Sequence, residues 1–416
     1  MPEGEGRGRI GVAVSYTNPN KVYALLDHRN KPTDSSTKIE PGAAEVYQSL
    51  DGGVSWKKTH TDELMIFAAL GWYFADIYVD PKSDDEIYAL GIRLAHSVDG
   101  GKTFGLVSGD VYHMFPSPAD PLHLDHCELW INPTNSSHIV LGNDGGLYVS
   151  YDKGNSWMHY NNIPTGEFYD ITLDQKDPYT IYGGTQDDAT VYGKAKEWNP
   201  EFYDEWKYLW IDPWSGGDGC ITVIDPVDTN TLFYSSQEGG VRRMDIQTKE
   251  STFIRPRIDS LKDKLRYHFI SPYFLSPHDH STLYLGGNYV LKGSNHGDTW
   301  NVISHDLLVG KSKKKNSMAI GALAESELKK GLLFAGTDKG LFWVSENDGK
   351  TWQDRSSGLP DMYIRTIVPS RFNASRVYVA MSGINYDDFG TYLYSSDDNG
   401  KSWKKLPATS HQKWLM

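Results

Sequence analysis

Acidic side chains recur at one repeated place in the sequence, and they are the first sign of chemistry. The segments HLDHCELWIN, TGEFYDITLD and GGDGCITVID place Asp125, Glu167 and Asp218 directly before short apolar runs. Two neighbouring carboxylates can act as general acid and base in glycoside hydrolysis, because crowding of like charges raises the pKa of one of them. We therefore expect these acids to include catalytic groups.

A second set of polar side chains follows the next apolar run of the same repeats, in GNDGG, GTQDD and SQEGG. The combined set of candidate catalytic residues is Asp144, Asp218, Asp125, Glu167, Asp187 and Glu238. The candidate polar substrate ligands are His123, His126 and Gln186. Asp-Gly pairs also form ordinary turns, so plain recognition without catalysis is an alternative. A divalent cation held by His123, Asp125, His126 and Asp218 is another, although HLDH has no diagnostic metal-ligand spacing and we assign no metal residue.

An aromatic insertion, KEWNPEFYDEWKYLWIDPWSGG, separates the fourth repeat from the fifth. It contributes the candidate substrate-binding residues Trp198, Trp206, Trp210 and Trp214. It starts after Gln186 and ends at Asp218, so we expect it to lie over or beside the acids. Rings beside carboxylates suit carbohydrate, although most of these rings are expected in the core.

The element that must position these residues is a repeat of about 52 residues, present eight times in the 416 residues. Each copy reads as four short strands rich in β-branched and aromatic residues, separated by turn residues. Such a repeat is typical of a β-propeller blade, so the predicted fold is all-β with about eight four-stranded blades. We expect the blades at 9–58, 73–106, 123–160, 166–198, 217–250, 267–303, 317–355 and 362–406, in one propeller that can be part of a longer protein.

Six copies contain an octapeptide: SLDGGVSW, SVDGGKTF, SYDKGNSW, GSNHGDTW, SENDGKTW and SDDNGKSW. It falls at the turn between the third and fourth strands. The acid or amide is expected to bond backbone N–H groups of its own turn, glycine to adopt the unusual backbone angles, and tryptophan to pack between strands. The residues in this structural role are Asp51, Asp99, Asp152, Asn295, Asn347 and Asp398.

These octapeptides resemble Asp boxes, also called BNR repeats. Together with GRIGVAVS, DHCELWINP, GNDGGLYVSYDKGNSW, YGGTQDD and GGDGC, they resemble the bacterial sortilin-N-terminal (VPS10-type) propellers, which are related to xyloglucanase-like glycosyl hydrolases. Xyloglucanases use two aspartates, and Asp144 is the residue we compare first with theirs. Eight units depart from the ten blades of sortilin and the paired seven-bladed rings of xyloglucanases. The resemblance implies an extracellular or periplasmic protein, although the N-terminus has no signal peptide and the compartment stays unknown.

Composition excludes several other classes. The net charge of −13 argues against nucleic acid as a partner, and no apolar run is long enough to span a membrane. Two cysteines form neither a disulfide framework nor a zinc pattern. The sequence FIRP at 253–256 is transposed relative to the sialidase motif, and an acidic site would repel an anionic sugar. The expected function is a carbohydrate-active propeller that binds or hydrolyses a polysaccharide without a cofactor. The alternative is a non-catalytic propeller of sortilin type that binds a protein or peptide.

Overall fold

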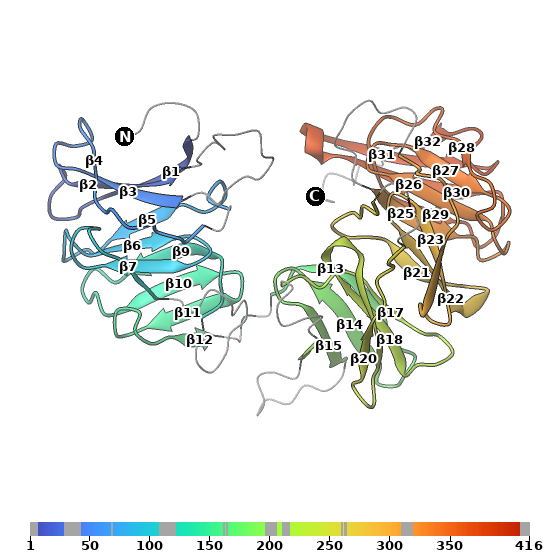
Figure 1. The fold of residues 1–416 in the computed structure, drawn as a ribbon, viewed down its shortest axis with the longest axis horizontal. Coiled ribbons are helices and arrows are strands. Elements are labelled where there is room, and N and C mark those ends of the chain that lie inside the picture. The colour runs from blue at the N-terminus through green and yellow to red at the C-terminus, as the bar shows by residue number, and fades with distance from the viewer. Residues whose placement is uncertain are drawn as a thin grey trace. The chain divides into compact units, whose positions relative to one another are not determined.

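The computed structural model describes residues 7–28, 43–67, 70–107, 122–160, 163, 165–195, 206–209, 217–258, 261, 264–308 and 319–407. Within these residues the chain is all-β, with 32 strands in eight four-stranded antiparallel sheets (Figure 1). The predicted fold of four-stranded blades is confirmed, and we call the sheets blades one to eight in chain order. No helix in the described part of the chain has the length and apolar character to cross a lipid bilayer.

Among the described residues the chain divides into two compact units, of which the first ends at Thr165 and the second begins at Gly166. The first unit holds three blades. Blade one is β1 (Arg7–Val14), β2 (Val22–His28), β3 (Ala43–Ser49) and β4 (Lys57–Lys58). Blade two is β5 (Asp76–Val79), β6 (Ile87–Leu90), β7 (Leu94–Ser97) and β8 (Gly105–Leu106). Blade three is β9 (His126–Ile131), β10 (Ile139–Asn143), β11 (Gly146–Ser150) and β12 (Met158–Tyr160).

The second unit holds five blades. Blade four is β13 (Phe168–Leu173), β14 (Thr180–Thr185), β15 (Thr190–Lys194) and β16 (Lys207–Leu209). Blade five is β17 (Thr222–Ile224), β18 (Thr231–Ser236), β19 (Gly240–Asp245) and β20 (Ser251–Phe253). Blade six is β21 (Tyr273–Ser276), β22 (Asp279–Gly286), β23 (Val290–Ser294) and β24 (Thr299–Val302). Blade seven is β25 (Ile320–Glu325), β26 (Leu333–Thr337), β27 (Phe342–Ser345) and β28 (Gln353–Asp354). Blade eight is β29 (Tyr363–Pro369), β30 (Val377–Gly383), β31 (Asp388–Ser396) and β32 (Lys404–Lys405).

The core lies between neighbouring blades. Second strands such as β6 and β26 are buried at every residue, because neighbouring blades cover both faces of the sheet. In the second unit, for example, Phe334 of blade seven packs with Ile364 and Val379 of blade eight. The fourth strands are different: β4, β8, β28 and β32 have only two residues each, and all of those residues are exposed.

Glycine allows two of these blades to approach closely. A Cβ atom on Gly184 in β14 would lie 2.0 Å from the backbone oxygen of Cys220, at the start of blade five. No side chain fits at that distance, so the contact between blades four and five requires glycine at this position.

The octapeptides form the expected turn between third and fourth strands, as the turn at Asp152 shows. The backbone N–H of Ser156 donates to Oδ1 of Asp152 (2.8 Å), and the Ser156 hydroxyl donates to Oδ2 (2.6 Å). The hydroxyl of Ser150 donates to Asp152 Oδ1 and accepts from the N–H of Gly154, each at 2.8 Å. Gly154 has φ 87°, which favours glycine. Matching bonds form at Asp51, Asp99, Asn347 and Asp398.

The fourth octapeptide, GSNHGDTW, departs from this pattern. Gly293 stands where the other turns have serine, so the anchoring hydroxyl is missing. The Asn295 side chain makes none of the turn bonds, and backbone bonds such as Gly297 N–H to Ser294 O (3.1 Å) hold the turn instead. Asn295 therefore does not hold its turn through its side chain, although its position in the octapeptide predicts that it does.

Tryptophans of the octapeptides connect neighbouring blades. The indole N–H of Trp300 in blade six donates to the carbonyl of Ile254, just after the last strand of blade five (2.8 Å). Trp352 and Trp403 bond in the same way to Ile303 and Arg355 of the blades before theirs (2.7 and 3.0 Å). The tryptophan therefore stabilises blade packing as well as its own turn.

We expect Asp152→Ala to lower the free energy of unfolding by about 1–2 kcal/mol, because it removes the acceptor of three hydrogen bonds at a partly exposed turn. Asn295→Ala is the matched control at the equivalent position and should change stability by less than about 0.5 kcal/mol. Urea denaturation followed by circular dichroism measures both. Equal losses in the two variants would contradict the role given to the carboxylate.

Candidate functional site

Asp218 joins the loops of two blades in the second unit. It lies just before β17 of blade five and is buried, with 7% of its surface exposed. Its Oδ1 accepts the backbone N–H of Asp187 in blade four (2.9 Å), and its Oδ2 accepts the side-chain amide of Gln237 in blade five. The Tyr169 hydroxyl lies 3.5 Å from Oδ1. Because both oxygens accept hydrogen bonds from protein groups, Asp218 fixes the loops around it. Its predicted catalytic role stays a prediction.

The loop between β14 and β15 is fixed by its own backbone. Asp187 and Ala189 both have left-handed angles, with φ 59° and 56°. Thr185 closes the loop, because its hydroxyl donates to the carbonyl of Ala189 (2.7 Å) and its carbonyl accepts from Gly219 N–H (3.0 Å). Gln186 N–H donates to the carbonyl of Glu167 (3.0 Å) at the start of the same blade. This arrangement holds Gln186 and Asp187 beside Glu167.

The corresponding loop of blade five carries Glu238. This residue is exposed and has φ 54°. Its N–H donates to the carbonyl of Phe269, at the entrance to blade six (2.9 Å). The Phe269 ring is 41% exposed and contacts Tyr169 edge-on, with ring centroids 6.3 Å apart. A backbone hydrogen bond therefore joins the Glu238 loop of blade five to the segment that carries Phe269, whose ring contacts blade four.

We call this set of residues the rim cluster. Its members are Glu167, Tyr169, Gln186, Asp187, Asp218, Gln237, Glu238 and Phe269. Burial, and then the charge of Asp218, raise the pKa of Tyr169 well above its ordinary value, so its hydroxyl stays protonated. Burial raises the pKa of the neighbouring Cys220 thiol to about 12, which excludes a thiolate nucleophile at that position. The cluster offers hydrogen-bond donors, acceptors and one exposed ring.

The remaining predicted polar residues lie in blade three of the first unit. His126 is fully buried, and burial together with His123 lowers its pKa to about 3, so its imidazole is neutral. His123 is also buried, and its Nδ1 lies 3.0 Å from the carbonyl of Leu124. Asp144 is exposed and accepts a weak bond from the Cys127 thiol (3.6 Å), which also contacts the carbonyl of Asp125. A substrate or cation at this place stays a prediction.

Only a short part of the aromatic insertion lies within the described residues. Residues 207–209 form the last strand of blade four, β16. β16 begins beside the end of β15, away from the loop that carries Gln186 and Asp187. Trp206 stands there, with its ring against Gly193 and 6.2 Å from the ring of Phe168. The expectation that the insertion lies over or beside the acids stays a prediction. Trp198, Trp210 and Trp214 lie outside the described residues.

Sequence reasoning missed Tyr169, Gln237 and Phe269 as members of this site. Gln237 directly precedes the predicted acid Glu238, and Tyr169 follows Glu167 by two residues. Their positions at blade mouths were thus readable from the repeat. Their contacts with Asp218 were not, because those contacts cross from one strand or blade to another.

The solved structures that are similar to this chain resemble it only weakly. No family model matches the chain. No curated protein sequence matches it significantly either. Two structures that are similar to it are the GH74 enzyme of Niastella koreensis (15% identity, TM-score 0.29) and the GH74 xyloglucanase of Xanthomonas campestris (14% identity, TM-score 0.28). The alignments cover 96% of this chain in both cases, but only 65% and 66% of those proteins.

A third similar structure is YCF48 bound to D1 peptide, with 12% identity, a TM-score of 0.26, and coverage of 90% of this chain and 94% of that one. At these values the similarity assigns no function. The fold assignment rests on the strand pairing described above.

Proposed function

We propose that the rim cluster binds a neutral polysaccharide or oligosaccharide. The observation that carries the proposal is the set of contacts that Asp218 makes. They hold the mouths of two blades together and fix carboxylate, amide and phenol groups in one place. Sugar hydroxyls both donate and accept hydrogen bonds, so they match such a mixed set. The partly exposed ring of Phe269 adds an apolar surface for a sugar face.

Binding, rather than hydrolysis, is the activity we assign to this cluster. Hydrolysis needs two carboxyl groups that flank one glycosidic bond, about 5 Å apart in retaining enzymes and about 6.5–9.5 Å apart in inverting ones. Asp218, the most central acid, has both oxygens occupied by protein donors. It is therefore a positioning residue in this proposal, and the exposed Glu167 and Glu238 supply the carboxylates that contact the ligand.

The experiment is a calorimetric titration of the protein with soluble neutral glycans, β-glucans first, with an assay for released reducing ends on the same samples. For a glycan that binds, we expect Glu238→Gln to raise the Kd by about tenfold or more, since a hydrogen bond to a charged group contributes about 1.5–3 kcal/mol. Glu250→Gln, an exposed residue of the same blade away from the rim, is the control and should leave the Kd unchanged.

Two outcomes would contradict the proposal. If no neutral glycan binds, or if Glu238→Gln and Glu250→Gln have equal effects, the rim cluster is not a sugar site. Release of reducing ends that survives Glu167→Gln and Glu238→Gln would place any hydrolysis elsewhere in the chain.

A second candidate function is the binding of a peptide by blade eight. Three large apolar side chains are exposed in the connection from β30 to β31 and at the start of β31, namely Ile384 (59%), Tyr386 (49%) and Phe389 (64%). Exposed apolar side chains that cluster on one loop favour a protein partner over a sugar. Loss of peptide binding in Tyr386→Ser, with glycan binding absent, would support this candidate instead.

A further inference from the structure

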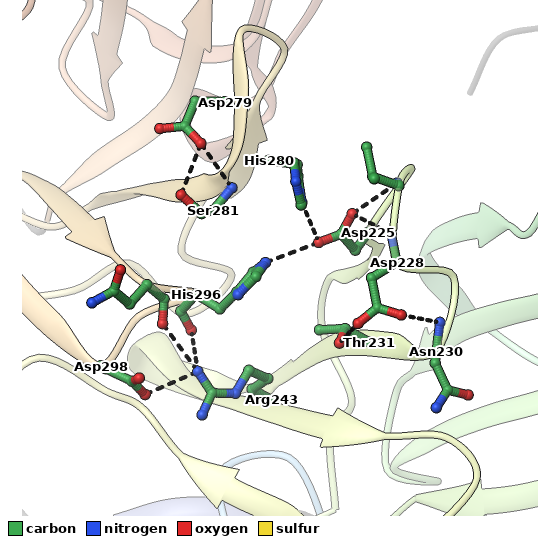
Figure 2. A network of polar contacts seen from close by, with 12 residues as sticks. Asp225, Asp228, Asn230, Thr231, Arg243, Asp279, His280, Ser281, His296 and Asp298 are labelled. Atoms are coloured by element: carbon green, nitrogen blue, oxygen red, sulfur yellow. Dashed lines mark hydrogen bonds and ion pairs between the residues drawn. The ribbon is translucent and has the colours of Figure 1, made fainter.

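Two histidines and a buried carboxylate converge between blades five and six, at the opposite end of β17 from Asp218. Asp225 follows β17, His280 lies in β22, and His296 lies in the turn between β23 and β24. Figure 2 shows both imidazoles directed at the Asp225 carboxylate. His280 Nδ1 is 2.9 Å and His296 Nε2 is 3.0 Å from the same oxygen, Oδ2. This group is separate from the rim cluster and from the function proposed for it.

The Asp225 carboxylate is held in one orientation. Its side chain has 0% of its surface exposed. Oδ1 accepts the backbone N–H groups of Val227 (2.8 Å) and Asp228 (3.0 Å), which leaves Oδ2 for the histidines. Hydrogen bonds of this kind orient the carboxylate ligands of metal sites.

His296 occupies a position that serves as a blade-to-blade contact elsewhere in the chain. It is the fourth residue of its octapeptide, as Lys153 is in blade three. The ammonium group of Lys153 reaches back to the buried Glu86 of blade two (2.7 Å), so that carboxylate is paired with a full positive charge. Asp225, which is more deeply buried, faces two imidazoles instead.

This difference in partner has a chemical consequence. A buried carboxylate is costly unless it is hydrogen-bonded and a positive charge lies beside it. A bound dication would supply such a charge at Asp225. Two imidazole nitrogens and one carboxylate oxygen are a donor set that Zn²⁺ and similar divalent transition metals accept.

We propose that Asp225, His280 and His296 bind a divalent transition-metal ion of the Zn²⁺ class. The three donor atoms lie within 4.8 Å of one another. An ion with bonds of about 2.0–2.2 Å needs neighbouring ligand atoms about 3–3.5 Å apart, so small rotations of the imidazoles suffice. In the bound form each imidazole is neutral and carries its proton on the ring nitrogen that does not face the ion.

The surroundings favour entry and retention of a cation. The side chains of His280 and His296 are 37% and 28% exposed, so both histidines lie at the protein surface, where solvent can supply further ligands to an ion. Arg243 fixes the turn that carries His296, because its Nη1 donates to the carbonyls of Asn295 and His296 (3.1 Å each). Its charge is balanced by Asp298, whose Oδ1 lies 2.9 Å away (Figure 2).

The test is a calorimetric titration of chelator-treated full-length protein with Zn²⁺, with the stoichiometry and the thermal unfolding midpoint as readouts. We expect one ion per chain and a rise of the midpoint with Zn²⁺, because a ligand that binds only the folded state stabilises it. Ca²⁺ and Mg²⁺ prefer all-oxygen sites and should produce neither effect.

Three variants make the test specific. His296→Gln keeps an N–H donor for Asp225 but removes the metal ligand, and we expect it to weaken Zn²⁺ binding by at least about tenfold without unfolding the protein. His280→Asn should act in the same way. His305→Ala, an exposed histidine of the same unit, is the control and should bind Zn²⁺ as the native chain does.

The proposal is overturned if Zn²⁺ does not bind at micromolar concentration. It is equally overturned if Zn²⁺ binds the His296→Gln and His280→Asn variants as tightly as the native chain. Asp225 would then be a hydrogen-bonded contact between two blades.

Discussion

Gly184→Ala is expected to lower the free energy of unfolding of the second unit by about 3 kcal/mol or more. The added Cβ would lie 2.0 Å from the backbone oxygen of Cys220 and 2.5 Å from its carbon, and backbone cannot rotate away as a side chain can. Blades four and five must therefore move apart. The expected loss of stability lies at the upper end of the range that overpacked cores show. Urea denaturation measures the loss.

The matched control for this substitution is Gly142→Ala. Gly142 lies in β10, the second strand of blade three, as Gly184 lies in the second strand of blade four. A Cβ there has only the carbonyl oxygen of Glu128 within 4 Å, at 3.9 Å. We expect this variant to be neutral or slightly stabilising, because alanine restricts the unfolded chain more than glycine does. Similar losses in both variants would show that strand glycines are needed for backbone freedom and not for blade contact.

Gly184→Ala also tests the rim cluster. The Cys220 backbone that would be displaced is two residues from Asp218, which holds the loop at Asp187. A folded variant that still binds the native chain's glycan with unchanged affinity would contradict the view that close approach of these two blades builds the site.

Asp225→Ala is the second substitution with a large expected effect. In metal-free protein it should lower the free energy of unfolding by about 3 kcal/mol, because the buried carboxylate accepts two backbone N–H groups and two imidazole N–H groups. The four donors come from a turn of blade five and two segments of blade six, so the substitution weakens both a turn and a blade contact.

Asp225→Asn separates these two contributions. Asparagine keeps an oxygen for Val227 and Asp228 but places an amide N–H₂ where the histidines now donate. We expect Asp225→Asn to lower the free energy of unfolding by less than Asp225→Ala does. The loss that remains comes from the contact between blades five and six. If both substitutions lower the free energy of unfolding by the same amount, the turn contributes nothing to it and the histidine contacts account for the whole effect. Urea denaturation of chelator-treated samples decides between these results.

The fold could be predicted from the sequence because the signal is repeated. Turn residues such as Asp152 and Gly154 recur with the same spacing in several blades, and the strands between them alternate in a regular way. Blade four was harder to predict. Like blade five, it has no octapeptide, and its last strand, β16, has three residues within a run of aromatic residues, so the sequence did not separate strand from connection.

The candidate sites were harder to predict because their contacts join distant segments. The repeat placed Asp218 at a blade mouth, but its bonds to Asp187 and Gln237 depend on how two loops fold back. Asp225 reads as part of an ordinary Asp-Pro turn, so the sequence pattern gives it no chemical role. The one signal for it was the defective octapeptide GSNHGDTW, where a histidine appears in a turn that has lost its serine.

The two-residue fourth strands have a consequence for the behaviour of this protein at high concentration. A sheet edge with unpaired N–H and C=O groups is a template on which another molecule can add a strand, and the chain carries one such edge per blade. Strands as short as β4 and β32 offer too few groups for stable addition, and both consist of two lysines whose like charges repel an incoming copy. The outer edges of blades one and eight therefore do not invite fibrous self-association.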